Sequence, residues 1–231
     1  MGKFYFGHLS YNGAHFNGWQ KQQVGIPTIQ SFLEEKLQDI FPRENQKVFA
    51  SSRTDAKVSA FAQPIKVLLP RMKGEITLMN ELNEVLKPHV KLITLSRINP
   101  SFKITHFVCS KTYLYFFSYS FKKDFPFVLK ISEACLLEGM KEAALAFVGK
   151  HNFKNYQYRS DVKGSFDREI YACEIIKANL LFRNMDDDIY VLRINGSGFL
   201  KQMVRLIFGT ILRYSSGSIS KKDIIKRFGT K

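Results

Sequence analysis

Hydrophobic and polar positions form short periodic runs along the first hundred residues, and these runs predict secondary structure. Residues 3–13 (KFYFGHLSYNG) alternate as a strand does and close on a turn pair, Asn12-Gly13. Residues 28–41 repeat apolar positions at helical spacing, and residues 75–87 do the same until Pro88 ends the pattern. Further strands are predicted at 47–52, 59–69 and 90–98.

The second half of the chain repeats this order loosely. An aromatic run at 112–121 (TYLYFFSYSF) predicts a strand, and residues 168–180 and 188–195 predict two more that pair across an acidic, turn-rich link. Three helices are predicted: 132–149 with Ser132 as N-cap and Gly149 as terminator, 198–214, and 220–229 starting at Ser220.

The order of these elements predicts the fold class. Strands that neighbour each other in sequence favour antiparallel pairing, so we expect an α+β protein with helices on one face of an antiparallel sheet. The repeated order predicts two related, ferredoxin-like halves with a cleft between them. We place the N-terminal half at 1–105 and the C-terminal half at 106–231, with the seam inside 100–112.

The net charge of the chain indicates which classes of molecule it binds. Lysine and arginine number 35 against 20 acidic residues, a net charge of +15, while the 45% hydrophobic content is ordinary for a globular protein. Nucleic acid is the first candidate partner, because many dispersed cations release the counterions of a phosphate backbone when they bind it, and this release favours binding. An anionic membrane surface is the second, and a merely soluble basic surface the third. The basic residues are spread over the whole chain, which favours nucleic acid.

The cysteines and the apolar runs exclude several classes. Cys109, Cys135 and Cys173 are far apart and odd in number, which fits neither a disulfide framework nor a zinc site. We interpret them as reduced residues of a cytoplasmic protein. The N-terminal stretch lacks the apolar core of a signal peptide, and no window approaches the length of apolar chain that a membrane span needs.

Asp55 is the residue on which we base a chemical hypothesis. It follows Arg53 in SSRTDAKVSAFAQ, between two predicted strands. Taken alone, an aspartate here is turn chemistry or a helix cap. An aspartate is also ionised at neutral pH and needs no base to act as a nucleophile, and on an extended segment Arg53 and Asp55 point the same way. A guanidinium beside the carboxylate would keep it charged and positioned.

Four motifs, one of which contains Asp55, occur along the chain in a fixed order. YNGAHFNGWQKQ (11–22) and SRTDAKVSA (52–60) come first, and SKTYLYFF (110–117) and GFLKQMVRLIFG (198–209) follow in the second half. Together they resemble the tRNA pseudouridine synthase I (TruA-type) family, and the resemblance runs collinearly from about residue 5 to 213. It implies an isomerase that converts uridines of the tRNA anticodon stem-loop, at positions 38–40, to pseudouridine with no cofactor and no metal.

The resemblance also implies roles for individual residues. Asp55 matches the catalytic aspartate that attacks the flipped uridine, Tyr113 the tyrosine that stacks on the uracil, and Arg205 the arginine that pairs with the nucleophile. Arg53 matches the arginine that helps displace the target nucleotide. Without the resemblance, Tyr113 is a core aromatic of a strand, and Arg205 belongs to a solvent face that it shares with Lys201.

Other positions are expected to contact RNA. We expect Arg53, Lys57, Lys111 and Lys21 to bind the substrate. Residues 150–166 interleave cations with aromatics, which suits an RNA-facing loop, although the aromatics could equally plug a sheet edge. The basic residues of this stretch are Lys150, Lys154, Arg159 and Lys163, and the aromatic residues considered are Phe153, Tyr156 and Tyr158.

The sequence departs from the family pattern near Asp55. Lys57 and Ser59 stand where relatives usually have glycine and histidine, and Thr105 replaces an arginine. A glycine often marks positive φ, so lysine at 57 strains or re-routes the loop or places a cation beside the nucleophile. These changes leave open a second hypothesis, a catalytically degenerate RNA-binding paralogue of the same fold. The resemblance further implies a homodimer bridged by tRNA.

Overall fold

A computed structural model describes residues 3–42, 46–69, 74–123, 125–158, 164–183, 185–186 and 188–229. The chain divides into two compact units, residues 1–108 and 109–231, and each is described by itself. Both combine helices with a sheet, so the α+β fold class is confirmed.

The first unit alternates strands and helices. Its elements are β1 (Lys3–Tyr11), α1 (Ile29–Ile40), β2 (Lys47–Ala50), β3 (Ala60–Leu69), α2 (Glu75–Leu86), β4 (Val90–Ile98) and a short 3₁₀ helix, η2 (Ile104–Phe107). The sheet has the order β2-β3-β1-β4, and every neighbouring pair is antiparallel. This β-α-β-β-α-β order is that of ferredoxin-like folds.

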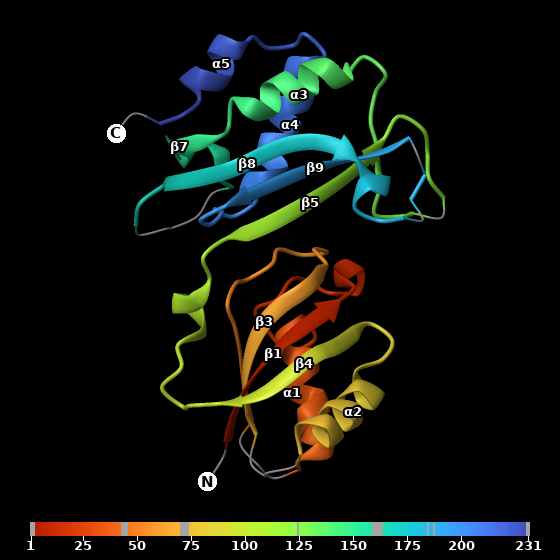
Figure 1. The fold of residues 1–231 in the computed structure, drawn as a ribbon, viewed down its shortest axis with the longest axis vertical. Helices are drawn as coiled ribbons and strands as arrows, with labels where there is room; N and C mark the ends of the chain where they lie inside the picture. The colour runs from red at the N-terminus through yellow and green to blue at the C-terminus, as the bar shows by residue number, and fades with distance from the viewer. Residues whose placement is uncertain are drawn as a thin grey trace. The chain divides into compact units, whose positions relative to one another are not determined.

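The apolar stripes predicted for the first unit form its core. Alternate residues of β1 are buried, and they pack against the buried stripes of α1 and α2, which lie on one side of the sheet (Figure 1). Thr28 is the N-cap of α1, and its side chain accepts from the backbone of Ser31. The predicted helix start is therefore confirmed by a capping box, which satisfies backbone N–H groups that a helix leaves unpaired.

The second unit has a five-stranded sheet. Its strands are β5 (Lys111–Ser118), β6 (Leu129–Lys130), β7 (Gly149–Asn152), β8 (Asp167–Lys177) and β9 (Ile189–Gly196), and its helices are α3 (Leu137–Leu145), α4 (Met203–Ser215) and α5 (Lys221–Lys226). The order is β6-β5-β9-β8-β7, with β6 parallel to β5 and the other pairs antiparallel. The core lies where α3 and α4 cover one side of this sheet (Figure 1).

The prediction for α3 was wrong at both ends. Ser132 does not cap the helix, because its hydroxyl accepts from Ala134 N within a turn, and α3 starts after Leu136. Cys135 Sγ donates to Leu212 O and Leu136 N donates to Ser215 O, so this segment is held by α4. The helix ends before Gly149, which opens β7 instead.

Helix α4 also starts later than predicted. Gln202 adopts the left-handed conformation with a φ of 56°, which ends any continuous helix from residue 198. Helix α5 starts as predicted, with Ser220 and Asp223 forming a second capping box.

Candidate active-site loop and its supports

Asp55 lies in the loop that joins β2 to β3. The Asp55 side chain is half-buried, while Arg53 is exposed. Residues 53–55 belong to no strand, so strand alternation does not set the directions of these two side chains. The backbone closes a turn just after the aspartate, where Val58 N donates to Asp55 O at 3.3 Å.

The segment between β1 and α1 holds this loop in place. Trp19 N donates to Thr54 O at 3.1 Å, and Lys57 N donates to Phe16 O at 3.0 Å. The Tyr11 hydroxyl lies 2.9 Å from Thr54 Oγ1. Because Phe16 and Trp19 are themselves buried, these bonds tie the aspartate loop to the hydrophobic core of the unit.

Two glycines of the same segment allow this close approach. At Gly18 a Cβ would lie 2.8 Å from Thr54 O, and its φ of +94° is a conformation that favours glycine. At Gly13 a Cβ would overlap the Val58 carbonyl, and Gly13 N donates to Ser59 Oγ at 2.9 Å. Ser59, which stands at the usual histidine position, thus supports the loop.

A buried glutamine on β3 supports the other end of the loop. Gln63 Nε2 donates to Ser52 O at 3.0 Å, and its side chain is buried. Sequence reasoning missed Gln63 and also Thr54. The available signal was a lone amide inside the apolar run of β3, since buried polar side chains are almost always hydrogen-bonded.

Lys57, at a position where the family pattern has glycine, has a left-handed backbone with a φ of 63°. Left-handed backbone costs a residue with a Cβ about 1–2 kcal/mol. We therefore expect Lys57→Gly to be more stable than Lys57→Ala by about 1 kcal/mol, because both variants lose the side chain and only glycine relieves the backbone. Urea unfolding of the two variants measures this difference, and equal stabilities would contradict a strained residue 57.

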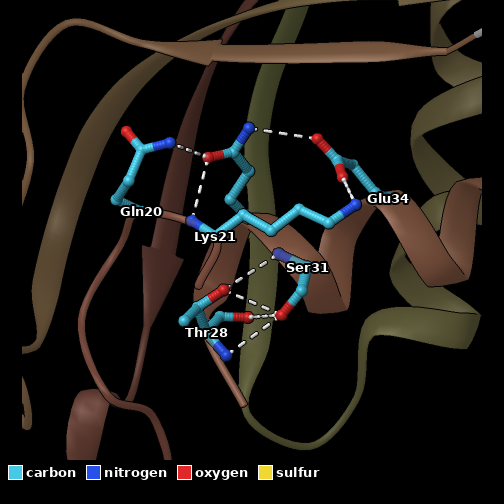
Figure 2. A network of polar contacts seen from close by, with 6 residues as sticks. Gln20, Lys21, Thr28, Ser31 and Glu34 are labelled. Carbon is cyan, nitrogen blue, oxygen red and sulfur yellow. Dashed lines mark hydrogen bonds and ion pairs between the residues drawn. The ribbon is translucent and has the colours of Figure 1, made fainter. Parts of the chain in front are cut away.

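Lys21 belongs to a polar network that joins the same segment to α1 (Figure 2). Its Nζ pairs with Glu34 Oε2 at 2.7 Å, and its backbone N donates to Gln30 Oε1 at 3.1 Å. Gln20 Nε2 donates to the same Gln30 oxygen at 3.0 Å. Lys21 is exposed, and its ion pair with Glu34 partly neutralises its charge. Its role in RNA binding stays a prediction.

Tyr113 and Arg205 both belong to the second unit. Tyr113 is on β5 opposite Ile194, half-buried, with its ring edge-on to Phe199 at 5.0 Å between centroids. It packs against the core cluster, as the interpretation without a family also expects. Arg205 is exposed in the first turn of α4. Asp55 is in the other unit, so a common cleft for the three side chains stays a prediction.

Lys111 is the first residue of β5 and is half-buried. Burial lowers the pKa of Lys111 below its usual value, and the nearby positive charge of Arg168 lowers it further. Arg168 in turn donates to the carbonyl of Ser165 at 2.9 Å. Two cations held close together cost folding free energy, and such a pair suits the binding of a phosphate. Sequence reasoning missed Arg168.

The stretch 150–166 does not present all its aromatics to solvent. Phe153 and Tyr156 are fully buried, with the Tyr156 ring packed against Phe147 and the Phe153 ring packed against Tyr156. The RNA-facing interpretation is therefore wrong for these two residues, which belong to the core. Tyr158 is exposed, with Lys201 Nζ 5.5 Å from its ring centroid. The predicted Arg159 and Lys163 lie outside the described residues.

The described residues contain neither a cluster of metal ligands nor a membrane-spanning helix. No group of three or more histidine, cysteine or acidic side chains in the described ranges is arranged to hold a metal ion. Within the same ranges, no helix has both the length and the apolar character needed to cross a membrane.

Comparisons with known proteins agree over most of the chain. A family model described as tRNA pseudouridine synthase matches residues 143–229. A protein of Mycoplasma genitalium named tRNA pseudouridine synthase A is 32% identical over 230 residues, covering 97% of this chain and 88% of the relative. A protein of Desulfotalea psychrophila named tRNA pseudouridine synthase A 2 is 30% identical over 228 residues, covering 94% and 86%. One of Bacillus anthracis with the latter name is 27% identical over 220 residues.

Proposed function

This chain belongs to the tRNA pseudouridine synthase A family, and we propose that it converts uridine to pseudouridine in tRNA with Asp55 as the nucleophile. The observation that carries the proposal is the fixed backbone of the Asp55 loop. Thr54 and Lys57, on either side of the aspartate, are bonded to the buried segment between β1 and α1. A nucleophile needs this positioning, since small misplacements of reacting groups cost large factors in rate.

The chemistry follows from the properties of a carboxylate. Asp55 attacks the target nucleotide at the base or at the sugar C1′, and the bond between uracil N1 and C1′ breaks. The uracil turns and C5 bonds to C1′, the bond between Asp55 and the nucleotide breaks and restores the carboxylate, C5 loses its proton and N1 gains one. The product is therefore an isomer of the substrate. The reaction has no redox step and consumes no other molecule.

Two further side chains have proposed roles. The half-buried ring of Tyr113 stacks on the displaced uracil, and its hydroxyl serves in removing the C5 proton. For Arg205 we propose the role that the resemblance implies, a guanidinium that pairs with the nucleophile. Arg53, which is exposed, helps to hold the nucleotide out of the stack.

We propose the anticodon stem-loop, positions 38–40, as the target. A base inside a stem cannot reach a side chain, so it must be extruded at a cost of a few kcal/mol. A-form RNA offers shape, phosphates and 2′-hydroxyls more than base edges, which matches a chain of net charge +15. We further propose a homodimer in the cytoplasm, which sedimentation and cell fractionation test.

The direct test uses purified protein and an unmodified tRNA transcript. Carbodiimide treatment followed by primer extension should show new stops at uridines 38–40 after incubation with the protein. A transcript with cytidines at these positions is the matched control. New stops at other uridines would show that the target site lies elsewhere in the tRNA. A transcript that shows no new stop after incubation with the protein would overturn the proposed function.

Lys111 offers a prediction that separates binding from stability. Its lowered pKa means that the folded chain holds the proton less tightly than the unfolded chain, so the charged lysine destabilises the fold at pH 7. Lys111→Gln should therefore raise the melting temperature at pH 7, by an amount that shrinks as the pH rises through the lowered pKa. It should also weaken tRNA binding and reduce the slope of log affinity against log salt by about 0.9.

The exposed Lys91 on β4 provides the control for Lys111. Lys91→Gln removes the same charge without relieving burial, so its melting temperature should stay near that of the wild type. If Lys111→Gln melts lower than the wild type at pH 7, the assignment of Lys111 as a destabilised binding cation is wrong.

A further inference from the structure

The sheet of the first unit has an outer face that turns away from α1 and α2. Alternate residues of β1 that are not in the core, among them Phe4, Phe6 and His8, lie on this face. Lys66 of β3 pairs with Phe6 across the sheet, and its Nζ lies 4.2 Å from the centroid of the Phe4 ring. The face is therefore aromatic and basic, which is unusual for the solvent side of a sheet.

Lys66 also anchors the segment that follows β4. Its Nζ donates to Pro100 O at 2.7 Å and to Phe102 O at 2.8 Å. The ring of Phe102 then meets Phe6 edge-on, with centroids 5.6 Å apart. The 3₁₀ helix η2 continues from here in contact with β2 and β3, the two strands that the Asp55 loop connects.

Phe107, the last residue of η2, forms a flat aromatic surface with Phe102. The two rings are stacked, with centroids 4.6 Å apart and planes 12° from parallel. Phe107 is 65% exposed. An exposed phenylalanine whose orientation is set by a second ring is pre-organised to stack on a third flat group, since its conformational entropy is already reduced.

The surroundings of Phe107 suit an anionic ligand with a flat apolar part. An open hollow of about 370 Å³ is lined by Asn99, Ser101, Phe102, Lys103, His106 and Phe107. Its lining contains one lysine and one histidine and no acidic residue. We call these six residues the Phe107 shelf.

We propose that the Phe107 shelf is a second RNA contact, on which one unpaired base of the bound tRNA stacks while Lys103 faces the adjoining phosphate. The inference rests on the proposed function for the identity of the ligand. Stacking on exposed aromatics beside cations is the general way in which proteins hold single-stranded nucleic acid, and it tolerates any base because every base has a π-face.

Three variants of the full chain test the shelf by tRNA affinity. Phe107→Ala should weaken binding of the unmodified transcript about tenfold, because a base–aromatic stack is lost. Phe107→Leu should weaken it nearly as much, since leucine keeps the apolar contact without the π-face. Ile76→Ala on α2 removes a comparably exposed apolar side chain, 74% exposed, from the helix side of the unit and should leave affinity unchanged.

The ligand's strandedness and charge give two more readouts. Phe107→Ala should weaken the binding of a single-stranded oligonucleotide that has the anticodon-loop sequence. It should leave the binding of the same sequence in a duplex unchanged, because the bases of a duplex are already stacked. Lys103→Gln should reduce the salt slope by about one, and Phe107→Ala should leave that slope unchanged because it removes no charge.

The outcomes separate the shelf from the proposed function. A wild type that makes pseudouridine, with Phe107→Ala binding tRNA as tightly as Ile76→Ala, overturns the shelf alone. Equal loss on duplex and single strand also overturns it. If Phe107→Ala instead changes the sedimentation coefficient and keeps full tRNA affinity, the surface is a protein interface and the proposal is wrong. A wild type that binds tRNA through Phe107 without making pseudouridine supports the shelf and overturns the function.

Discussion

Asp55→Asn should abolish pseudouridine formation, with a rate loss of roughly 10⁴-fold or more, while tRNA affinity stays within about twofold of the wild type. Asparagine has the same shape as aspartate but no charge, so it cannot act as the nucleophile. The loop itself should survive, because the bonds made by the backbone of Thr54 and Lys57 and by the Thr54 hydroxyl are unchanged in this variant.

Tritium release provides the measurement for Asp55. The bond from C5 to C1′ replaces the C5–H bond, so a transcript labelled with tritium at C5 loses its label to water once per turnover. Asp39→Asn is the matched control: Asp39 is an exposed residue of α1 that pairs with Lys36 at 3.3 Å, and exposed pairs contribute little to stability. Release by Asp55→Asn at the wild-type rate would end the case for this residue.

Gly13→Ala should destabilise the fold by about 2–3 kcal/mol and slow the reaction roughly 10²-fold. The new Cβ would overlap the Val58 carbonyl and lie 2.9 Å from Ser59 N, and both of these are backbone atoms that cannot rotate away. The strand end or the Asp55 loop must therefore shift. A shift of the loop moves the nucleophile, and misplacement by about 1 Å is enough to cost 10²-fold.

Gly74→Ala is the control for Gly13→Ala. Gly74 precedes α2 with a φ of −56°, and the nearest atom to an added Cβ is Thr77 Oγ1 at 3.9 Å, so we expect a change within about 0.5 kcal/mol. Urea unfolding and tritium release are measured on both variants. A Gly13→Ala protein with wild-type stability and rate would show that the close packing of the two segments is not needed.

Local sequence determined the elements that depend on near neighbours. Thr28 with Ser31 and Ser220 with Asp223 start α1 and α5 as predicted, because a capping box is formed by residues three apart. The strands β1, β3, β4 and β5 follow from apolar and aromatic patterns within a few residues. The pairing of β8 with β9 follows from the turn-rich link between them. The motifs around Asp55 also identified the loop that β2 and β3 enclose.

The supports of that loop were beyond local reasoning. Nothing within a few residues of Gly13 or Gly18 requires glycine there; the requirement comes from Val58 and Thr54, forty or so positions away in the chain. The same holds for Gln63, whose partner Ser52 is known only once β2 and β3 are paired.

Tertiary contacts also decided which predicted features survived. The α3 start moved to Leu137 because α4 holds Cys135 and Leu136. Tyr156 is a core residue because Phe147 packs on it, and Phe153 packs on Tyr156 in turn. Whether these aromatics are buried depends on which segments pack against them, and the spacing of Phe153 and Tyr156 does not encode that. The sequence by itself therefore determined most of the helices and strands and named the candidate residues. The tertiary structure alone decided how the Asp55 loop is held, which aromatic side chains remain exposed, and which charged lysine destabilises the fold.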